Sequence, residues 1–211
     1  MGLLMLVRHG QASWGADDYD VLSPRGHEQA AVTGRHLATG PPPGVVVHGA
    51  MRRQRETARA LVDAAGWDVP VREDPRWDEM DHEALLSAQP WEGDPRADRA
   101  QFQAWFEAAT DRWVAGDDDG DYAEPWPVFD TRVQEALSAL GSDGSAMAVT
   151  SGGPIAAVTA ALLGGGRTAY ARVAPVVVNA SVTRVIAGRR GLSLLSLNEH
   201  DHLRGELRTY R

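Results

Sequence analysis

Short apolar runs alternate along the chain with stretches in which apolar residues recur every three or four positions. The runs are bounded by glycine, proline or polar residues, which is typical of strands buried in a sheet. Strands are predicted at residues 3–7, 45–47, 146–150, 181–187 and 192–197. Helices are predicted at residues 24–39, 53–65, 128–140 and 155–163. This order predicts an α/β fold, a three-layer sandwich with a mostly parallel central sheet.

The pattern breaks between about residues 74 and 125. Apolar residues there share one face of a predicted amphipathic helix, at Phe102, Trp105, Phe106, Ala109 and Trp113. The segment 74–124 is also acidic, with 15 acidic and four basic residues. The run Asp117–Asp121 lacks the spacing and the closing glutamate of a calcium-binding loop, so no metal is expected there. We therefore predict a single domain over residues 1–211, with a helical cap inserted at about 74–125.

The composition excludes several classes of protein. With 43% apolar and 24% charged residues, the chain is typical of a globular protein. It has no apolar run long enough to cross a bilayer, and its apolar start is more typical of a core strand than of a signal peptide. A cytoplasmic protein without a membrane partner is expected. The net charge of -8 argues against nucleic-acid binding, and the absence of cysteine excludes disulfides and thiolate chemistry.

Polar residues that can bind an anion gather just after the predicted strands. Arg8 and His9 follow the first strand, Arg53 opens the helix after the second, and Ser151 follows the strand at 146–150. Glu79 lies on the connection into the insertion. Because the carboxyl ends of parallel strands meet at one edge of a sheet, we expect these residues to lie together. Arginine side chains and helix N-termini both favour a phosphoryl group, so a phosphate pocket is predicted.

Five segments, in order along the chain, resemble the signatures of the histidine phosphatase (phosphoglycerate-mutase-like) superfamily. They are LVRHGQ at 6–11, DVLSPRGHEQA at 20–30, Arg53 with Thr57-Ala58, GGPI at 152–155 and NASVT at 179–183. A single match of this kind is weakly specific, whereas five in the right order are strongly so. The resemblance implies an α/β fold and either a phosphatase or a mutase.

The resemblance also implies a role for each matched residue. His9 would attack phosphorus and carry the phosphoryl group, while Arg8 and Arg53 would hold its oxygens and stabilise the charge that develops. Glu79 would protonate the leaving oxygen, with Asp78 as the alternative acid. Further contacts to the phosphate are expected from Gln11, Ser151 and Gly152. No cofactor and no metal ion are expected, because the guanidinium groups supply the positive charge.

The chain departs from the family pattern at two positions. Ser151 stands where the family usually carries a second histidine, and Gly49 stands where it has a serine. A serine hydroxyl forms a neutral hydrogen bond where a protonated histidine forms a charge-assisted one, which costs about 1–3 kcal/mol of transition-state stabilisation. Another histidine could supply the missing cation; the candidates are His200, His202, His48 and His82.

These observations favour a metal-independent phosphomonoester hydrolase that acts on a small phosphorylated metabolite through a phosphohistidine on His9. One alternative is a phosphoglycerate-mutase-type phosphotransferase, although the acidic insertion offers no basic cluster for a second phosphate. The other is a phosphate-binding pseudoenzyme of low activity, which the serine at 151 motivates. A strand expected at Val176–Val178 lies either inside the sheet or at an edge, where it could pair with a second subunit in a homodimer.

Overall fold

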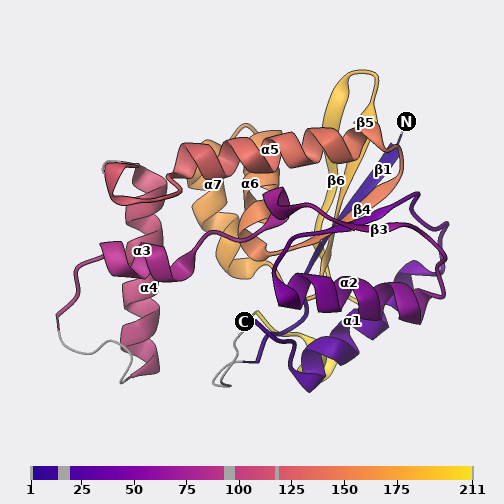
Figure 1. Ribbon diagram of the computed structural model, residues 1–211, viewed down its shortest axis with the longest axis horizontal. Coiled ribbons are helices and arrows are strands. Elements are labelled where there is room, and N and C mark those ends of the chain that lie inside the picture. Colours follow the sequence, from indigo (N-terminus) through magenta and orange to yellow (C-terminus); the bar gives the residue numbers. More distant parts are fainter. Residues whose placement is uncertain (1, 14–19, 93–97, 117–118, 211) are drawn as a thin grey trace. The chain divides into compact units, whose positions relative to one another are not determined.

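Six strands form one sheet within the part of the chain that the computed structural model describes, which is residues 2–13, 20–92, 98–116 and 119–210. The strands are β1 (Gly2–Arg8), β2 (Val46–His48), β3 (Val71–Glu73), β4 (Ala146–Thr150), β5 (Val182–Gly188) and β6 (Gly191–Glu199). Their order is β3-β2-β4-β1-β5-β6, and the first four are parallel to one another (Figure 1). The hairpin β5–β6 adds two antiparallel strands beyond β1. The predicted mostly parallel sheet is therefore confirmed.

Helices cover both faces of this sheet (Figure 1). In the larger unit of the chain these are α1 (Pro24–Leu37), α2 (Arg52–Ala65), the second part of α5 (Trp126–Ser142), α6 (Gly152–Leu162) and α7 (Gly166–Val173). Two further helices, α3 (His82–Ala88) and α4 (Arg99–Ala115), belong to a smaller unit. Short 3-10 turns lie at Pro75–Trp77, Asp119–Asp121, Ala174–Val176 and Gly205–Leu207. On the face covered by α1 and α2, one apolar cluster includes Leu37, Ala58, Leu61, Val7, Val46 and Val149. Because side chains alternate along a strand, Leu4, Leu6 and Ala148 are buried on the opposite face.

The ends of the first two helices follow from local sequence. Ser23 caps α1, because its side chain accepts a hydrogen bond from the backbone N–H of Gly26, and Pro24 occupies the first turn. Gly66 ends α2 with a φ of 65°, a left-handed conformation that glycine adopts without strain. Helix α2 begins shortly after β2 ends, and α1 begins after the loop that follows β1. Both helices therefore start on the side of the sheet where the phosphate pocket is predicted.

The chain divides into two compact units, and residues Met80–Arg132 form the smaller one. It contains α3, α4 and the first part of α5, and its core includes Trp113, whose ring lies edge-on to the rings of Trp126 and Phe129 at 5.2 Å. The helix predicted around Trp113 is α4, so the helix is confirmed, with Ala109 and Trp113 buried and Phe102, Trp105 and Phe106 half-buried. Asp117 and Asp118, at the start of the predicted solvated loop, lie outside the described residues.

Two features differ from the sequence-based expectations. Strand β3 and helices α3 and α7 were not predicted, since β3 has only three residues, all exposed, and α3 and α7 are short. The prediction of a strand at Val176–Val178 is wrong. Residues Ala174–Val176, with Pro175 among them, form a 3-10 turn, and the N–H of Val178 donates to the Asn198 side chain (2.8 Å). No helix among the described residues is long and apolar enough to cross a membrane.

Candidate functional site

His9 lies just beyond the end of β1 and is almost fully buried. Its backbone N–H donates to the carbonyl of Thr150 on the neighbouring strand (2.7 Å). The ring atom Nδ1 lies 2.7 Å from the carbonyl oxygen of Gly10. Because that oxygen can only accept, Nδ1 carries the hydrogen and Nε2 carries the lone pair. The local geometry therefore sets the tautomer that a nucleophilic imidazole needs.

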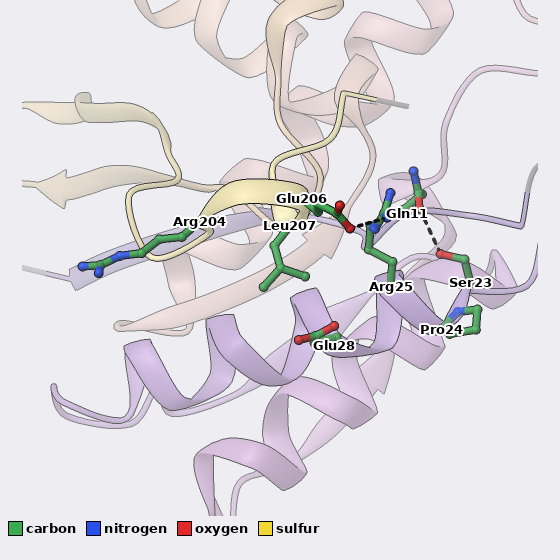
Figure 2. Close-up of a pocket in the computed structure, with 8 residues that line it drawn as sticks. All are labelled: Gln11, Ser23, Pro24, Arg25, Glu28, Arg204, Glu206 and Leu207. Carbon is green, nitrogen blue, oxygen red and sulfur yellow. Dashed lines mark hydrogen bonds and ion pairs between the residues drawn. The ribbon is translucent and has the colours of Figure 1, made fainter.

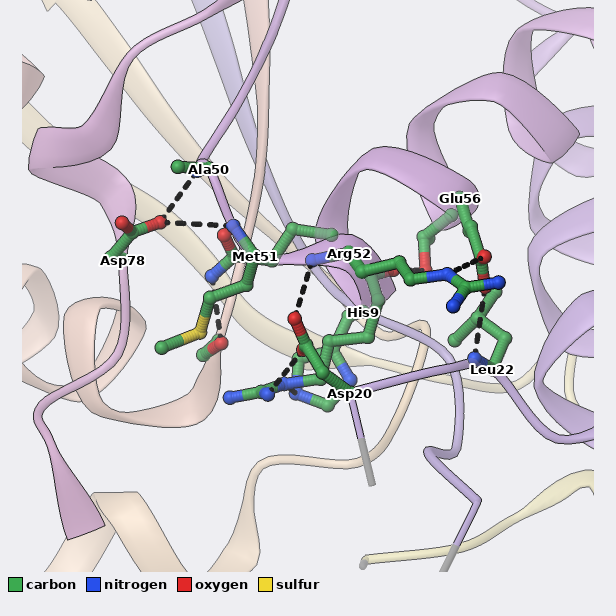
Figure 3. A network of polar contacts seen from close by, with 12 residues as sticks. His9, Asp20, Leu22, Ala50, Met51, Arg52, Glu56 and Asp78 are labelled. Atoms are coloured by element: carbon green, nitrogen blue, oxygen red, sulfur yellow. Dashed lines mark hydrogen bonds and ion pairs between the residues drawn. The ribbon is translucent and has the colours of Figure 1, made fainter. Parts of the chain in front are cut away.

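Arg53 brings a guanidinium group to this lone pair. It lies in the first turn of α2, is only 5% exposed, and its Nε–H donates to Nε2 of His9 (3.3 Å). Its Nη1 donates to a carboxylate oxygen of Asp20 (2.6 Å). The second oxygen of Asp20 accepts the backbone N–H of Arg52 (2.7 Å), as Figure 3 shows. The Asp20 carboxylate thus contacts both Arg53 and the N-terminus of α2, as a bound anion would.

The turn between β4 and α6 contacts the other candidate residues one after another. Thr150 accepts the His9 N–H, and the Ser151 hydroxyl accepts a hydrogen bond from the Gln54 amide (2.8 Å). The next residue, Gly152, faces Arg8, since a Cβ on it would lie 3.7 Å from the Arg8 Nε. Within this larger unit of the chain, the turn is what brings residues from β1, α2 and α6 to one edge of the sheet.

Glu79 is held by Gly153, the second residue of α6. Its Oε2 accepts the backbone N–H of Gly153 at the start of α6 (3.0 Å). A Cβ on Gly153 would lie 2.0 Å from the other oxygen of Glu79 and 3.3 Å from the hydroxyl of Tyr170. Burial, and then the charge of Glu79, raise the pKa of Tyr170 well above its ordinary value, so the phenol stays protonated. Glu79 therefore lies among hydrogen-bond donors at a helix N-terminus.

Asp78, the alternative acid, occupies a different environment. One of its oxygens accepts the backbone N–H of Ala50 (2.6 Å) and lies 3.4 Å from that of Met51, the residue that caps α2 (Figure 3). These contacts satisfy backbone donors just before the helix, as a capping side chain does. The geometry favours a structural role for Asp78.

Arg8 and Gln11 complete the set of predicted residues. The Arg8 Nη1 donates to the backbone carbonyls of Val177 and Tyr210, the latter at 2.8 Å, so the C-terminal segment holds this side chain. The side chain of Gln11 accepts a hydrogen bond from the Ser23 hydroxyl (3.2 Å). Gln11 also borders an open groove of about 710 Å³, which Figure 2 shows between α1 and the C-terminal segment. The groove is lined by Gln11, Ser23, Pro24, Arg25, Glu28, Arg204, Glu206 and Leu207, and not by His9 or Arg53.

The four histidines that could replace the missing cation lie in different places. His48 ends β2 at the same edge of the sheet as His9, and its Nδ1 likewise contacts the carbonyl of the following glycine (2.7 Å). The ring of His202 instead contacts Thr33 (2.9 Å), and burial lowers its pKa to about 4, so it is neutral near pH 7. His200 contacts the Asn198 carbonyl, and His82 belongs to the smaller unit.

Sequence reasoning missed Asp20, Gln54 and Tyr170, which contact Arg53, Ser151 and the surroundings of Glu79 respectively. Asp20 and Gln54 could have been noticed, since Asp20 opens a matched segment and Gln54 follows Arg53 directly. Nothing in the sequence around Tyr170 indicates its neighbour. Among the described residues, no group of three or more histidine, aspartate or glutamate side chains is arranged to hold a metal ion.

Comparison with known proteins places the chain in a family. Its residues 4–200 match the model of the histidine phosphatase superfamily (branch 1). It is 36% identical over 179 residues to a glucosyl-3-phosphoglycerate phosphatase of Mycolicibacterium vanbaalenii, which covers 76% of this chain and 74% of that protein. It is 34% identical over 115 residues to a 2,3-bisphosphoglycerate-dependent phosphoglycerate mutase of Thermobifida fusca, which covers 50% of this chain and 46% of the mutase. The match thus spans about half the length of that mutase.

Solved structures agree on the fold. A mycobacterial glucosyl-3-phosphoglycerate phosphatase in complex with VO3 superimposes with a TM-score of 0.69 at 24% identity, over 94% of this chain and all of the other. Phosphoglycerate mutase from Bacillus anthracis gives a TM-score of 0.67 at 17% identity, over 95% of this chain and 94% of the mutase. At such identities the likeness speaks for the fold alone, whereas the family model covers nearly the whole chain. The chain therefore belongs to the histidine phosphatase superfamily, whose members related to it include both phosphatases and phosphoglycerate mutases.

Proposed function

We propose that this protein is a metal-independent phosphomonoesterase that hydrolyses a small phosphorylated metabolite through a phosphohistidine on His9. The observation that carries the proposal is the state of the His9 ring. Its Nδ1 is committed to the Gly10 carbonyl, and its Nε2 lone pair faces the guanidinium of Arg53. A nucleophile beside a fixed cation is the arrangement that phosphoryl transfer requires.

In the first step, Nε2 of His9 forms a bond to phosphorus while the bond from phosphorus to the leaving oxygen breaks. Glu79 donates its proton to that oxygen, so the product leaves as an alcohol. In the second step, Glu79 takes a proton from water, the water oxygen bonds to phosphorus, and the bond from phosphorus to Nε2 breaks. Arg53 and Arg8, with the N-termini of α2 and α6, stabilise the charge on the phosphoryl oxygens in both steps.

Hydrolysis is favoured over mutase chemistry by charge and by similarity. A mutase must hold a second phosphate group, and the segment 74–124 has 15 acidic but only four basic residues. The phosphatase relative aligns over 76% of this chain, whereas the mutase relative aligns over 50%. These observations support a substrate with one phosphate group and a small, weakly charged remainder.

The proposal is tested by hydrolysis of an aryl phosphate and of a panel of phosphorylated metabolites in the presence of EDTA. Wild type should release phosphate, and rapid quenching in base should trap an acid-labile phosphoprotein. His9→Ala should abolish both signals, whereas His27→Ala, at a half-exposed histidine of α1, should change neither. Transfer of the phosphoryl group between hydroxyls of one substrate, without release of phosphate, would instead indicate a mutase. Phosphate binding without turnover on the whole panel would indicate a pseudoenzyme.

A further inference from the structure

Gln54 is a fully buried side chain that contacts Ser151, the residue found in place of the family's second histidine. Its Nε2 donates to the Ser151 hydroxyl oxygen (2.8 Å) and to the backbone carbonyl of Trp77 (3.2 Å). Ser151 is itself fully buried and directly follows the residue that accepts the His9 N–H. A polar side chain from α2 therefore reaches the phosphate end of β4.

The orientation of the Gln54 amide is defined by its surroundings. The Trp77 carbonyl oxygen can only accept hydrogen bonds, and it also accepts one from the Thr150 hydroxyl (2.5 Å). The reverse amide orientation would place one carbonyl oxygen against another, so Nε2 and not Oε1 must face Trp77 and Ser151. The Ser151 oxygen is thereby used as an acceptor, and its own hydrogen has no acceptor among the described residues.

The second departure from the family pattern meets the same amide. A Cβ on Gly49 would lie 2.0 Å from the Gln54 Oε1 and 2.9 Å from its Cδ. These separations are far below van der Waals contact, so a serine at position 49 and this placement of Gln54 exclude each other. The Gln54 amide thus occupies space that is available only when residue 49 is glycine. The same amide donates a hydrogen bond to Ser151.

We propose that Ser151 and Gln54 together replace the second histidine of the phosphate pocket. Ser151 is a catalytic residue that donates its hydroxyl hydrogen to a phosphoryl oxygen. Gln54 is a positioning residue that holds the hydroxyl in the donating orientation, and Gly49 makes the room it needs. The inference rests on the proposed function for the identity of the anion, because the geometry itself specifies only a hydrogen-bond donor at the phosphate end of the sheet.

The pair has a consequence that a histidine does not have. Neither an amide nor a hydroxyl titrates between pH 5 and 9, so this donor keeps its strength over that range. A hydrogen bond from a neutral hydroxyl to a charged oxygen corresponds to about a tenfold change in rate or affinity. Removing either member of the pair should therefore weaken catalysis and phosphate binding without introducing a new pH dependence.

The test is a double-mutant cycle with Ser151→Ala, Gln54→Met and the double variant, in which methionine matches the length of glutamine but donates no hydrogen bond. We expect each single change to lower kcat/KM about tenfold, and the double variant to be little worse than either one, because the two residues act as one donor. Gln134→Met is the matched control, since Gln134 lies on α5 and its amide donates to the Ala157 carbonyl (3.4 Å). Additive losses, or an unchanged Ser151→Ala variant, would overturn the proposal.

Gln54→Glu separates positioning from packing. The carboxylate has nearly the same shape but can only accept, so it would take the Ser151 hydrogen away from the phosphoryl group. Activity should fall, and adding Ser151→Ala should then cost no further activity. The melting temperature should fall by a similar amount in both variants, because the buried carboxylate also faces the Trp77 carbonyl. All variants are also titrated calorimetrically with inorganic phosphate. If wild type binds phosphate but does not turn over, the proposed function fails, and an unchanged phosphate affinity in Ser151→Ala would separately refute the pair.

Discussion

Replacing Gly153 with alanine should remove the proposed acid while leaving the fold intact. A Cβ at this position would lie 2.0 Å from the Glu79 Oε1 and 3.0 Å from its Cδ, against an ordinary contact distance of 3.4 Å or more. The obstructing atoms belong to the end of a flexible side chain, so the carboxylate must retreat by roughly 1.4 Å while the backbone of α6 stays in place. Gly153 is not among the residues with positive φ. Alanine in a helix stabilises by about 0.5–1 kcal/mol relative to glycine, so the melting temperature should hold or rise.

The loss of activity should depend on the leaving group. A displacement of about 1 Å in a catalytic group can cost about a hundredfold in rate, and general acids contribute about 10²–10⁴-fold. An alkyl phosphate, whose alcohol is a poor leaving group, should therefore lose about a hundredfold in kcat/KM, which reports the step in which the leaving group departs. A nitrophenyl phosphate, whose phenolate leaves without a proton, should lose less than about tenfold.

The assay compares kcat/KM on the two substrates for wild type, Gly153→Ala, Glu79→Gln and a helical control. Gly141→Ala serves as the control, because a Cβ there would make ordinary contacts of 3.8 Å with Leu192 and Leu4. Gly153→Ala and Glu79→Gln should show the same selective loss on the alkyl substrate. Equal losses on both substrates, at unchanged melting temperature, would refute the assignment of Glu79 as the acid.

Two further predictions concern charge. Burial, and then the stacked ring of His36 at 4.7 Å, lower the pKa of His202 to about 4, below its unfolded value of about 6.5. The unfolded chain therefore binds more protons between these values, and the free energy of unfolding should fall by about 1–2 kcal/mol from pH 7 to pH 4, after allowing for partial exposure of the ring. Urea unfolding at several pH values measures this, and His202→Gln should flatten that part of the profile; an unchanged slope would contradict it. Asp20→Asn should tighten inhibition by inorganic phosphate about three- to tenfold, because phosphate then competes with an amide and not a carboxylate for Arg53. Weaker inhibition in a steady-state assay would mean that Asp20 positions Arg53 instead.

The larger features of the fold could be predicted because they repeat along the chain. Buried strands such as β4 are continuous apolar runs, and α1 and α2 carry their capping residues and apolar spacing in the sequence. Strand β3 could not be predicted, because its three residues are exposed and owe their conformation to pairing with β2. The valines at 176–178 have high strand propensity, but Pro175 and the Asn198 side chain impose a different conformation.

The site was predictable where it follows directly from strand ends. His9, Arg53 and Ser151 lie next to the ends of neighbouring parallel elements, so strand order alone brings them to one edge. The contacts between these residues and their partners are not predictable, since Gln54 and Ser151 are 97 residues apart. The charge of Glu79 acts on Tyr170, which lies on a helix that the sequence pattern does not indicate. Such contacts depend on packing between α2, α6 and α7, which no local pattern encodes.

The two departures from the family pattern also bear on whether the protein is an enzyme. A site that merely decayed would lose its histidine and leave a cavity, with no reason to keep a buried amide oriented by two hydrogen bonds. Here Gln54 donates to Ser151 and occupies the space that a Cβ on residue 49 would fill. This arrangement supports a hydrogen-bond donor that is kept in use at the phosphate end of the sheet. The same donor serves turnover and passive phosphate binding, and the trapping experiment on His9 decides between them.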